Sequence, residues 1–149
     1  MDEAVFQEYL KAWRNRKKEA ERRQAESLRQ AREAAAKLAR ILVQDYRARE
    51  VWLFGSLARV RGFHRRSDID LAASGLPAQE FFRILSRLNA ATDFAVDLVD
   101  LEACPPWLAA AIRKEGKLLG GKLREKRRFL CALKLKRIFF PWWDNSTTL

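Results

Sequence analysis

Apolar residues recur every three or four positions from Asp2 to Tyr46, in a stretch that contains neither Gly nor Pro. The series runs through these positions: Phe6, Leu10, Trp13, Leu28, Ala31, Ala35, Leu38 and Leu42. A period of 3.6 in residues with good helix propensity predicts one long amphipathic helix, or two in line. The stripe is narrow and Ala-rich over residues 14–32, so that part either projects onto a partner or lies exposed in solvent.

After residue 50 the pattern changes to short apolar runs bounded by turn residues. Three of these runs have strand character: residues 51–54, 69–73 and 94–101. Two other segments, at residues 78–91 and 105–115, have helical spacing, and Leu118-Leu119 adds a last short strand. Strands and helices therefore follow one another within a single core-forming segment.

The length of 149 residues and the hydrophobic content of 48% predict one compact domain with appendages. We divide the chain into a helical extension (1–37), a core domain (38–119) and a basic, aromatic-ended tail (120–149). No apolar run is long enough to span a bilayer and the start lacks the pattern of a secretory signal, which together predict a cytoplasmic protein. Cys104 and Cys131 lack the spacing of a metal knuckle, so we interpret both as ordinary thiols.

The net charge of +11 is concentrated toward the ends of the chain. Residues 113–137 carry 11 Lys and Arg against 2 Asp and Glu, whereas residues 51–112 carry 6 against 7. The tail therefore has the character of a basic amphipathic segment for a nucleic acid, a membrane surface or a protein groove. Alternatively, it folds back over the domain.

Three aspartates are the candidates for chemistry. Asp68 and Asp70 stand two residues apart at the start of a strand, so both carboxylates point to the same side. Two adjacent carboxylates repel each other unless a cation lies between them, which favours a hard divalent ion such as Mg²⁺. Asp97 interrupts the apolar face of another strand, a costly position unless the carboxylate is paired or metal-bound. It is the natural third ligand.

Gly55-Ser56, directly after the first strand, is the candidate phosphate-binding turn. Glycine lets the backbone approach a ligand, and exposed N–H groups can cradle phosphates. Positive charge is available from the following loop, at Arg59, Arg61, Arg65 and Arg66. Each piece alone is weak evidence, because such pairs of aspartates are common by chance; the ordered combination is far more specific.

The segment LFGSLARVRGFHRRSDIDLA resembles the signature of the minimal nucleotidyltransferases of the polymerase-β superfamily, and FAVDLVDL resembles that family's strand with the third carboxylate. The resemblance covers residues 38–119. It implies an α+β fold with a small mixed β-sheet and helices packed on one side, here with a long N-terminal helix added. One difference is that Gly62 stands two residues later than the glycine in the family's usual Gly-Ser-x-Ala-Arg-Gly.

The resemblance also implies a site. Asp68, Asp70 and Asp97 would be the catalytic residues and would bind two Mg²⁺ ions. Nucleotide contacts would come from Gly55, Ser56, Arg59 and Ser67, with ATP as the substrate. The lone His64 ranks as a loop or phosphate-contacting residue.

Among small proteins, the domain resembles the antitoxin of HEPN/MNT toxin–antitoxin modules, which transfers AMP to a tyrosine of its HEPN-domain toxin partner. The stripe over residues 20–42 offers a docking surface for such a helical partner. The alternatives are an antibiotic-modifying nucleotidyltransferase, or a degenerate transferase that acts only as a binding module.

Overall fold

The computed structural model describes residues 2–59 and 61–121 of the chain. The helices are α1 (Glu3–Asp45), α2 (Gly55–Arg59), α3 (Phe81–Ala90) and α4 (Pro106–Glu115), and a short 3-10 turn, η1 (Ala78–Glu80), precedes α3. The strands are β1 (Glu50–Phe54), β2 (Ile69–Ser74), β3 (Val96–Asp100) and β4 (Lys117–Gly121). The predicted tail lies outside the described residues except for Gly120 and Gly121, which end β4.

The four strands form one mixed sheet in the order β3-β2-β1-β4. β1 is antiparallel to both β2 and β4, whereas β2 and β3 are parallel. A parallel pair requires a crossover connection, and η1 with α3 provides it between β2 and β3. The predicted α+β class, small mixed sheet and long N-terminal helix are confirmed.

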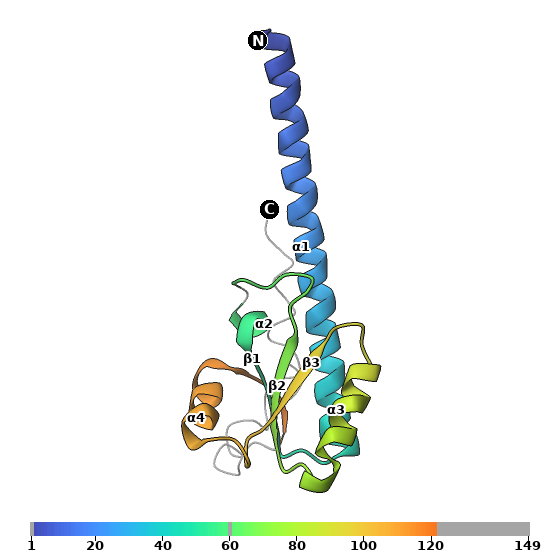
Figure 1. Ribbon diagram of the computed structural model, residues 1–149, viewed down its shortest axis with the longest axis vertical. Coiled ribbons are helices and arrows are strands. Elements are labelled where there is room, and N and C mark those ends of the chain that lie inside the picture. Colours follow the sequence, from blue (N-terminus) through green and yellow to red (C-terminus); the bar gives the residue numbers. More distant parts are fainter. Residues whose placement is uncertain (1, 60, 122–149) are drawn as a thin grey trace, which may run out of the picture.

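Helices cover both faces of this sheet, as Figure 1 shows. α1 and α3 pack on the face that carries Val51 and Leu53, whereas α4 packs on the face that carries Trp52 and Phe54. The sequence resemblance placed the helices on one side, and α4 departs from that arrangement. The reason is that the second face is also apolar, at Ala72 and Val99 among others, and it needs its own cover.

Helix α1 is much longer than the domain that it supports. Its 43 residues extend over about 65 Å at the usual rise of 1.5 Å per residue. Its buried residues all lie in the second half: Ala31, Ala35, Leu38, Ala39 and Leu42. The docking surface predicted over residues 20–42 is therefore wrong for residues 31–42, because the domain's own core already covers that stripe.

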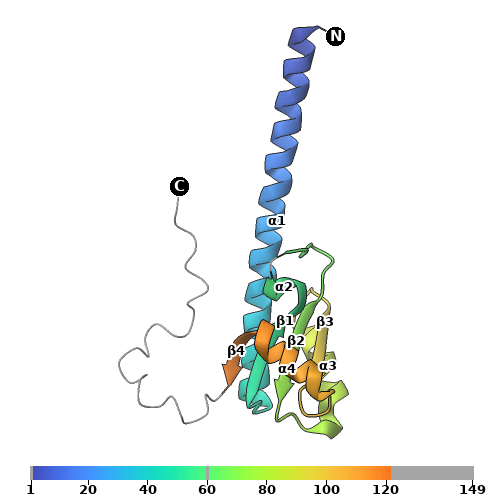
Figure 2. The same ribbon diagram turned by 90° about the vertical axis from the view of Figure 1, so that its left-hand side faces the viewer.

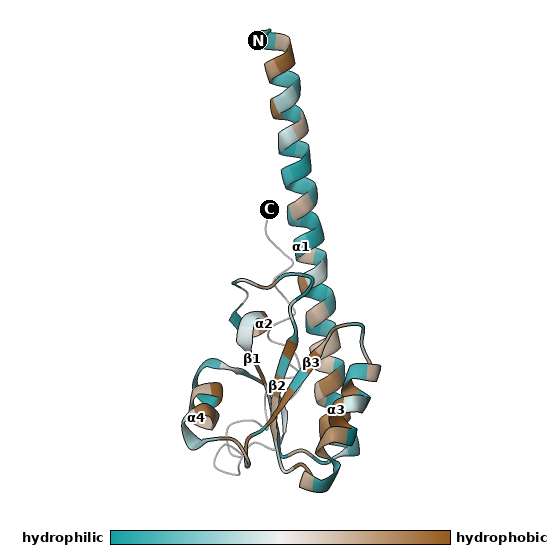
Figure 3. Cartoon of the chain, viewed as in Figure 1, coloured by the Kyte–Doolittle hydropathy of each residue, from teal (hydrophilic) through white to brown (hydrophobic). Residues whose placement is uncertain are grey.

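The first half of α1 extends beyond the domain in both perpendicular views (Figures 1 and 2). It is mostly hydrophilic, with hydrophobic residues again close to the N-terminus (Figure 3). No helix of the described residues is long and apolar enough to cross a membrane.

Candidate nucleotide and metal site

The ends of three strands meet at one end of the sheet. Because β1 runs antiparallel to β2, its last residue, Phe54, pairs with Asp70 near the start of β2. Because β3 runs parallel to β2, Asp70 in turn pairs with Asp97 near the start of β3. Adjacent strands lie about 4.8 Å apart, so the two carboxylates project from neighbouring positions on the same face. Asp68 precedes β2 by one residue, at the same end.

Gly55 lies directly against the Asp70 carboxylate. Its backbone is left-handed, with φ +70°, and a Cβ atom at this position would stand 2.0 Å from Oδ2 of Asp70. Only glycine combines this backbone conformation with such a close approach. The glycine after β1 thus belongs to the same site as the aspartates that follow it in the sequence.

Helix α2 begins at this glycine, where the sequence predicted only a tight turn. Ser56 is therefore part of the helix and is half-buried. Leu57 and Ala58 are buried, which anchors α2 to the core and fixes the position of Gly55.

Burial and two neighbouring carboxylates both act on Asp70. Partial burial raises the pKa of Asp70, and the negative charges of Asp97 and Asp68 raise it further. An anionic Asp70 is thus an unfavourable group that a cation would stabilise. Three carboxylates are oxygen donors of the kind that Mg²⁺ prefers, so the donor set fits a divalent ion.

The aspartates do not yet form a closed coordination shell. Among residues 2–59 and 61–121, no three His, Cys, Asp or Glu side chains already stand together as a metal site. Mutual repulsion opposes such an arrangement without a cation. Asp68 and Asp97 are exposed, and Asp70 is half-buried, so two of the three side chains have room to move.

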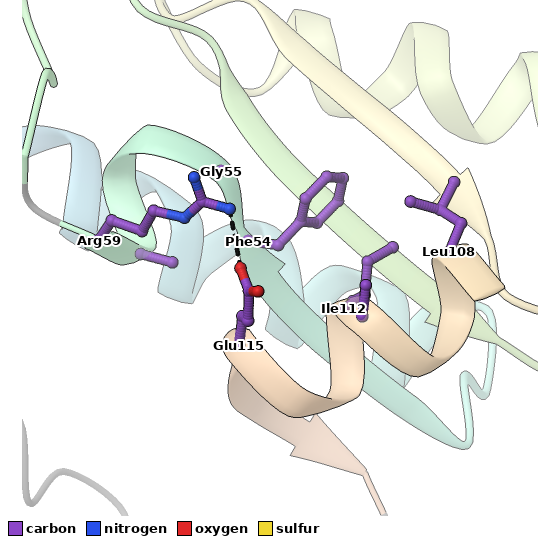
Figure 4. A pocket seen from close by; sticks show the side chains of 8 residues that line it. Phe54, Gly55, Arg59, Leu108, Ile112 and Glu115 are labelled. Carbon is purple, nitrogen blue, oxygen red and sulfur yellow. Dashed lines mark hydrogen bonds and ion pairs between the residues drawn. The ribbon is translucent and has the colours of Figure 1, made fainter.

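A shallow pocket lies beside this site, between the end of β1, α2 and α4. Its lining includes Phe54, Gly55, Arg59, Ile112 and Glu115 (Figure 4). The pocket holds about 120 Å³, well below the roughly 300–1,000 Å³ of a pocket that encloses a small ligand. A nucleoside triphosphate would therefore lie largely on the open surface.

Arg59, a predicted nucleotide contact, is held by Glu115. Its guanidinium donates a hydrogen bond to Oε2 of Glu115 at 2.8 Å, across the mouth of the pocket (Figure 4). No local pattern could indicate this acceptor, because Glu115 lies 56 positions away at the end of α4.

We expect Glu115→Gln to tighten ATP binding, because Glu115 competes with phosphate for Arg59. The pair is exposed, so the gain should be at most about fivefold, and the free energy of unfolding should change by less than about 1 kcal/mol. Isothermal titration calorimetry measures the first and chemical denaturation the second. Glu102→Gln, which removes the exposed pair with Arg49, is the matched control. Equal ATP affinities in both variants would show that Arg59 does not contact the triphosphate.

The loop between α2 and β2 is shaped by its own contacts. Ser67 accepts a hydrogen bond on its Oγ from the backbone N–H of His64 at 3.0 Å, and its own N–H donates to the His64 carbonyl at 2.8 Å. His64 is exposed, and its Nδ1 accepts from the backbone N–H of Arg66. Ser67 and His64 thus close a turn that leads into Asp68.

The same loop is tied to α1. Phe63 is buried in the main core, and its carbonyl accepts a hydrogen bond from the side chain of Gln24. Sequence reasoning missed both residues, because neither carries a motif and the contact joins positions 39 residues apart. Arg61, Arg65 and Arg66 remain exposed on this anchored loop.

Comparison with known proteins places this geometry in a family. The family model described as "Polymerase beta, Nucleotidyltransferase" matches residues 36–125. The chain therefore belongs to the polymerase-β nucleotidyltransferase family, whose members generally use a nucleoside triphosphate and a divalent metal ion. Among proteins with curated descriptions, none is significantly similar in sequence.

Solved structures of toxin–antitoxin complexes share the fold. A chain of a toxin–antitoxin complex with AMP-PNP is 29% identical, with a TM-score of 0.54 over 63% of this chain and 79% of its own. A chain of the Shewanella oneidensis complex of a tri-AMPylated HEPN toxin with its MNT antitoxin is 25% identical, with a TM-score of 0.51 over 68% and 81%. A chain of the MntA-HepT toxin–antitoxin structure is also 25% identical, with a TM-score of 0.50 over 66% and 79%.

Proposed function

We propose that this protein is an antitoxin that transfers AMP from ATP to a tyrosine hydroxyl of a HEPN-domain toxin, in a Mg²⁺-dependent reaction. The observation that carries the proposal is the meeting of Gly55, Asp70 and Asp97 at one end of the sheet. This arrangement places a close-approaching backbone beside carboxylates that favour a cation. The similar toxin–antitoxin structures, one with AMP-PNP and one with a tri-AMPylated HEPN toxin, support the choice of nucleotide and acceptor.

Asp68, Asp70 and Asp97 would hold the metal ions, and Gly55, Ser56, Arg59 and Ser67 would contact the nucleotide. Metal ions bound there would neutralise the triphosphate and lower the pKa of the acceptor hydroxyl. Asp97 is the exposed carboxylate on the edge strand β3, so it can accept the proton of an incoming hydroxyl. The hydroxyl oxygen then bonds to the α-phosphorus, the bond to the β-phosphate oxygen breaks, and pyrophosphate leaves.

The openness of the site favours a protein as acceptor. Asp97 lies on an edge strand, and the adjoining pocket is too small to enclose a second small substrate. A tyrosine on the surface of another protein can approach from the open edge, whereas a pocket of about 120 Å³ is small for an antibiotic. The size of this pocket therefore supports a protein acceptor over an antibiotic.

We expect co-expression with a HEPN-domain toxin, the class of acceptor proposed here, to yield a modified partner. Intact-mass spectrometry should show the added mass of one AMP per transfer, and peptide mapping should place it on tyrosine. The transfer should be repeated with purified proteins and should stop when EDTA removes the metal. An unmodified partner in the presence of a stable complex, ATP and Mg²⁺ would support the binding-module alternative instead.

A further inference from the structure

The N-terminal half of α1 is a projecting arm that the domain leaves uncovered. We define the arm as residues 3–24. Its exposed large apolar side chains gather near the free end, with exposed fractions of 55% for Val5, 42% for Phe6, 59% for Tyr9 and 48% for Trp13. Gln24 marks its base, where the side chain contacts the loop beside the aspartates. From Gln24 to Phe6 the helix rises about 27 Å.

The apolar stripe of the arm lies on the side of α1 that, further along the helix, packs against the domain. Phe6, Leu10 and Trp13 are spaced three and four residues apart, like the buried residues further along α1. The two sets of positions therefore belong to one stripe. Gln24 lies on the same line and contacts the carbonyl of Phe63. The stripe therefore borders the space above the loop that leads into Asp68. Figures 1 and 2 show the arm extending past this end of the sheet.

The arm is strongly basic next to its apolar end. Lys11, Arg14, Arg16, Lys17 and Lys18 are all exposed, and no carboxylate lies among residues 9–18. Lys17 stands 5.5 Å from the centre of the Trp13 ring, so positive charge adjoins the aromatic surface directly. Such a surface complements an apolar groove edged by carboxylates.

A second copy of the chain fits this surface poorly. In a parallel pair the apolar stripes of the two copies would face each other. Each stripe, however, lies on the same side of α1 as its own domain, so the two domains would stand between the helices. Lys17 of one copy would also face Lys17 of the other. An antiparallel pair would overlap only near the tips, over fewer than the three to four heptads of apolar positions that sustain a coiled coil.

We infer that the arm docks the acceptor protein and holds it over the three aspartates. The acceptor is then a compact helical domain with an apolar groove edged by Asp and Glu. A rise of about 27 Å matches the diameter of a small domain, so a protein of that size resting on the arm lies above the end of the sheet at which β2 and β3 begin, beside Asp70 and Asp97. This inference rests on the proposed function for the identity of the acceptor.

The test uses the full chain and the HEPN-domain protein proposed as the acceptor. The double variant Phe6→Ser with Trp13→Ser removes two exposed aromatic anchors and should weaken the complex about 100-fold in calorimetry, since buried aromatic anchors dominate interfaces. The KM for the protein acceptor should rise by a similar factor. The kcat and the stabilisation by ATP and Mg²⁺ should not change. Phe82→Ser, which removes an aromatic residue that is 82% exposed on α3, is the matched control.

A charge variant tests the same surface without removing apolar side chains. Lys11→Glu with Lys18→Glu should slow association about tenfold at low salt and make the rate nearly independent of salt, because the steering charge is lost. Circular dichroism should show an unchanged helix content in both variants. An unchanged association rate in the charge variant would overturn the inference.

The outcomes separate the arm from the chemistry. If the aromatic variant keeps the affinity and KM of the wild type while AMP transfer proceeds, the docking inference is overturned and the proposed function stands. If the aromatic variant loses the complex but the wild type never transfers AMP, the docking inference stands and the proposed function falls. Dimerisation, or binding to RNA or anionic vesicles, that depends on Phe6 and Trp13 while HEPN affinity does not, would overturn the inference in favour of that other occupant.

Discussion

Replacing Asp70 by Asn should reduce AMP transfer by about 10²- to 10³-fold, the scale on which loss of one essential electrostatic group acts. It should also leave the free protein as stable as the wild type or more stable at neutral pH. The reason is that burial and the charges of Asp97 and Asp68 already raise the pKa of Asp70, so its anionic form is disfavoured in the native state. Transfer assays and thermal unfolding without ligands measure the two effects.

The stability difference should depend on pH in a defined direction. A group whose pKa is raised on folding contributes stability at low pH that is lost as the pH rises through its folded pKa. The wild type should therefore approach the variant in stability below the usual carboxyl range and fall behind it at neutral pH. A variant that is less stable than the wild type at pH 7 would contradict this account of the site.

Bound ATP and Mg²⁺ should make the wild type more stable than Asp70→Asn, the reverse of the order without ligands. ATP together with Mg²⁺ should raise the unfolding midpoint of the wild type more than either alone, and this synergy should vanish in Asp70→Asn. Asp100→Asn is the matched control, because Asp100 belongs to the same strand as Asp97. Its Oδ1 accepts a hydrogen bond from the backbone N–H of Glu102, away from the three aspartates of the site. That variant should keep both the synergy and the transfer.

Gly55→Ala should also abolish transfer, through geometry rather than charge. The new Cβ atom would stand 2.0 Å from Oδ2 of Asp70, so the carboxylate must turn away from its position beside Asp97. The left-handed backbone, with φ +70°, should add a cost in stability of about 1–2 kcal/mol. Transfer assays and chemical denaturation measure the two effects.

Gly62→Ala separates these two causes. Gly62 has a similar left-handed backbone, with φ +77°, but a Cβ atom there would meet nothing within 4 Å. This variant should lose a comparable amount of stability and retain transfer. Equal losses of transfer in both glycine variants would mean that backbone strain in the loop, and not displacement of Asp70, disables the enzyme.

The sequence by itself determined the local elements and the candidate residues. The helical period before residue 46, the apolar runs of the strands and the alternation around Asp97 each depend on neighbours in the chain, and the structure confirms the corresponding elements. The family signature also depends on local spacing, which is why residues 36–125 match the family without knowledge of the fold.

Only the tertiary structure decided which residues meet. Strand order and register pair Asp70 with Asp97, and the approach of Gly55 to Asp70 depends on how α2 packs. The cover of the second sheet face by α4, and the pairing of Arg59 with Glu115, join positions too distant in the chain to leave a local signal.

Helix α1 shows most clearly what a sequence pattern determines and what only packing decides. Its periodic stripe is continuous in sequence, so the pattern could not tell which part would be buried. The domain covers the stripe from Ala31 onward and leaves Phe6 and Trp13 exposed, because the sheet and α3 are too short to reach further along a helix of 43 residues. Burial depends on what lies opposite a surface in space, and the local pattern of a single helix does not contain that information.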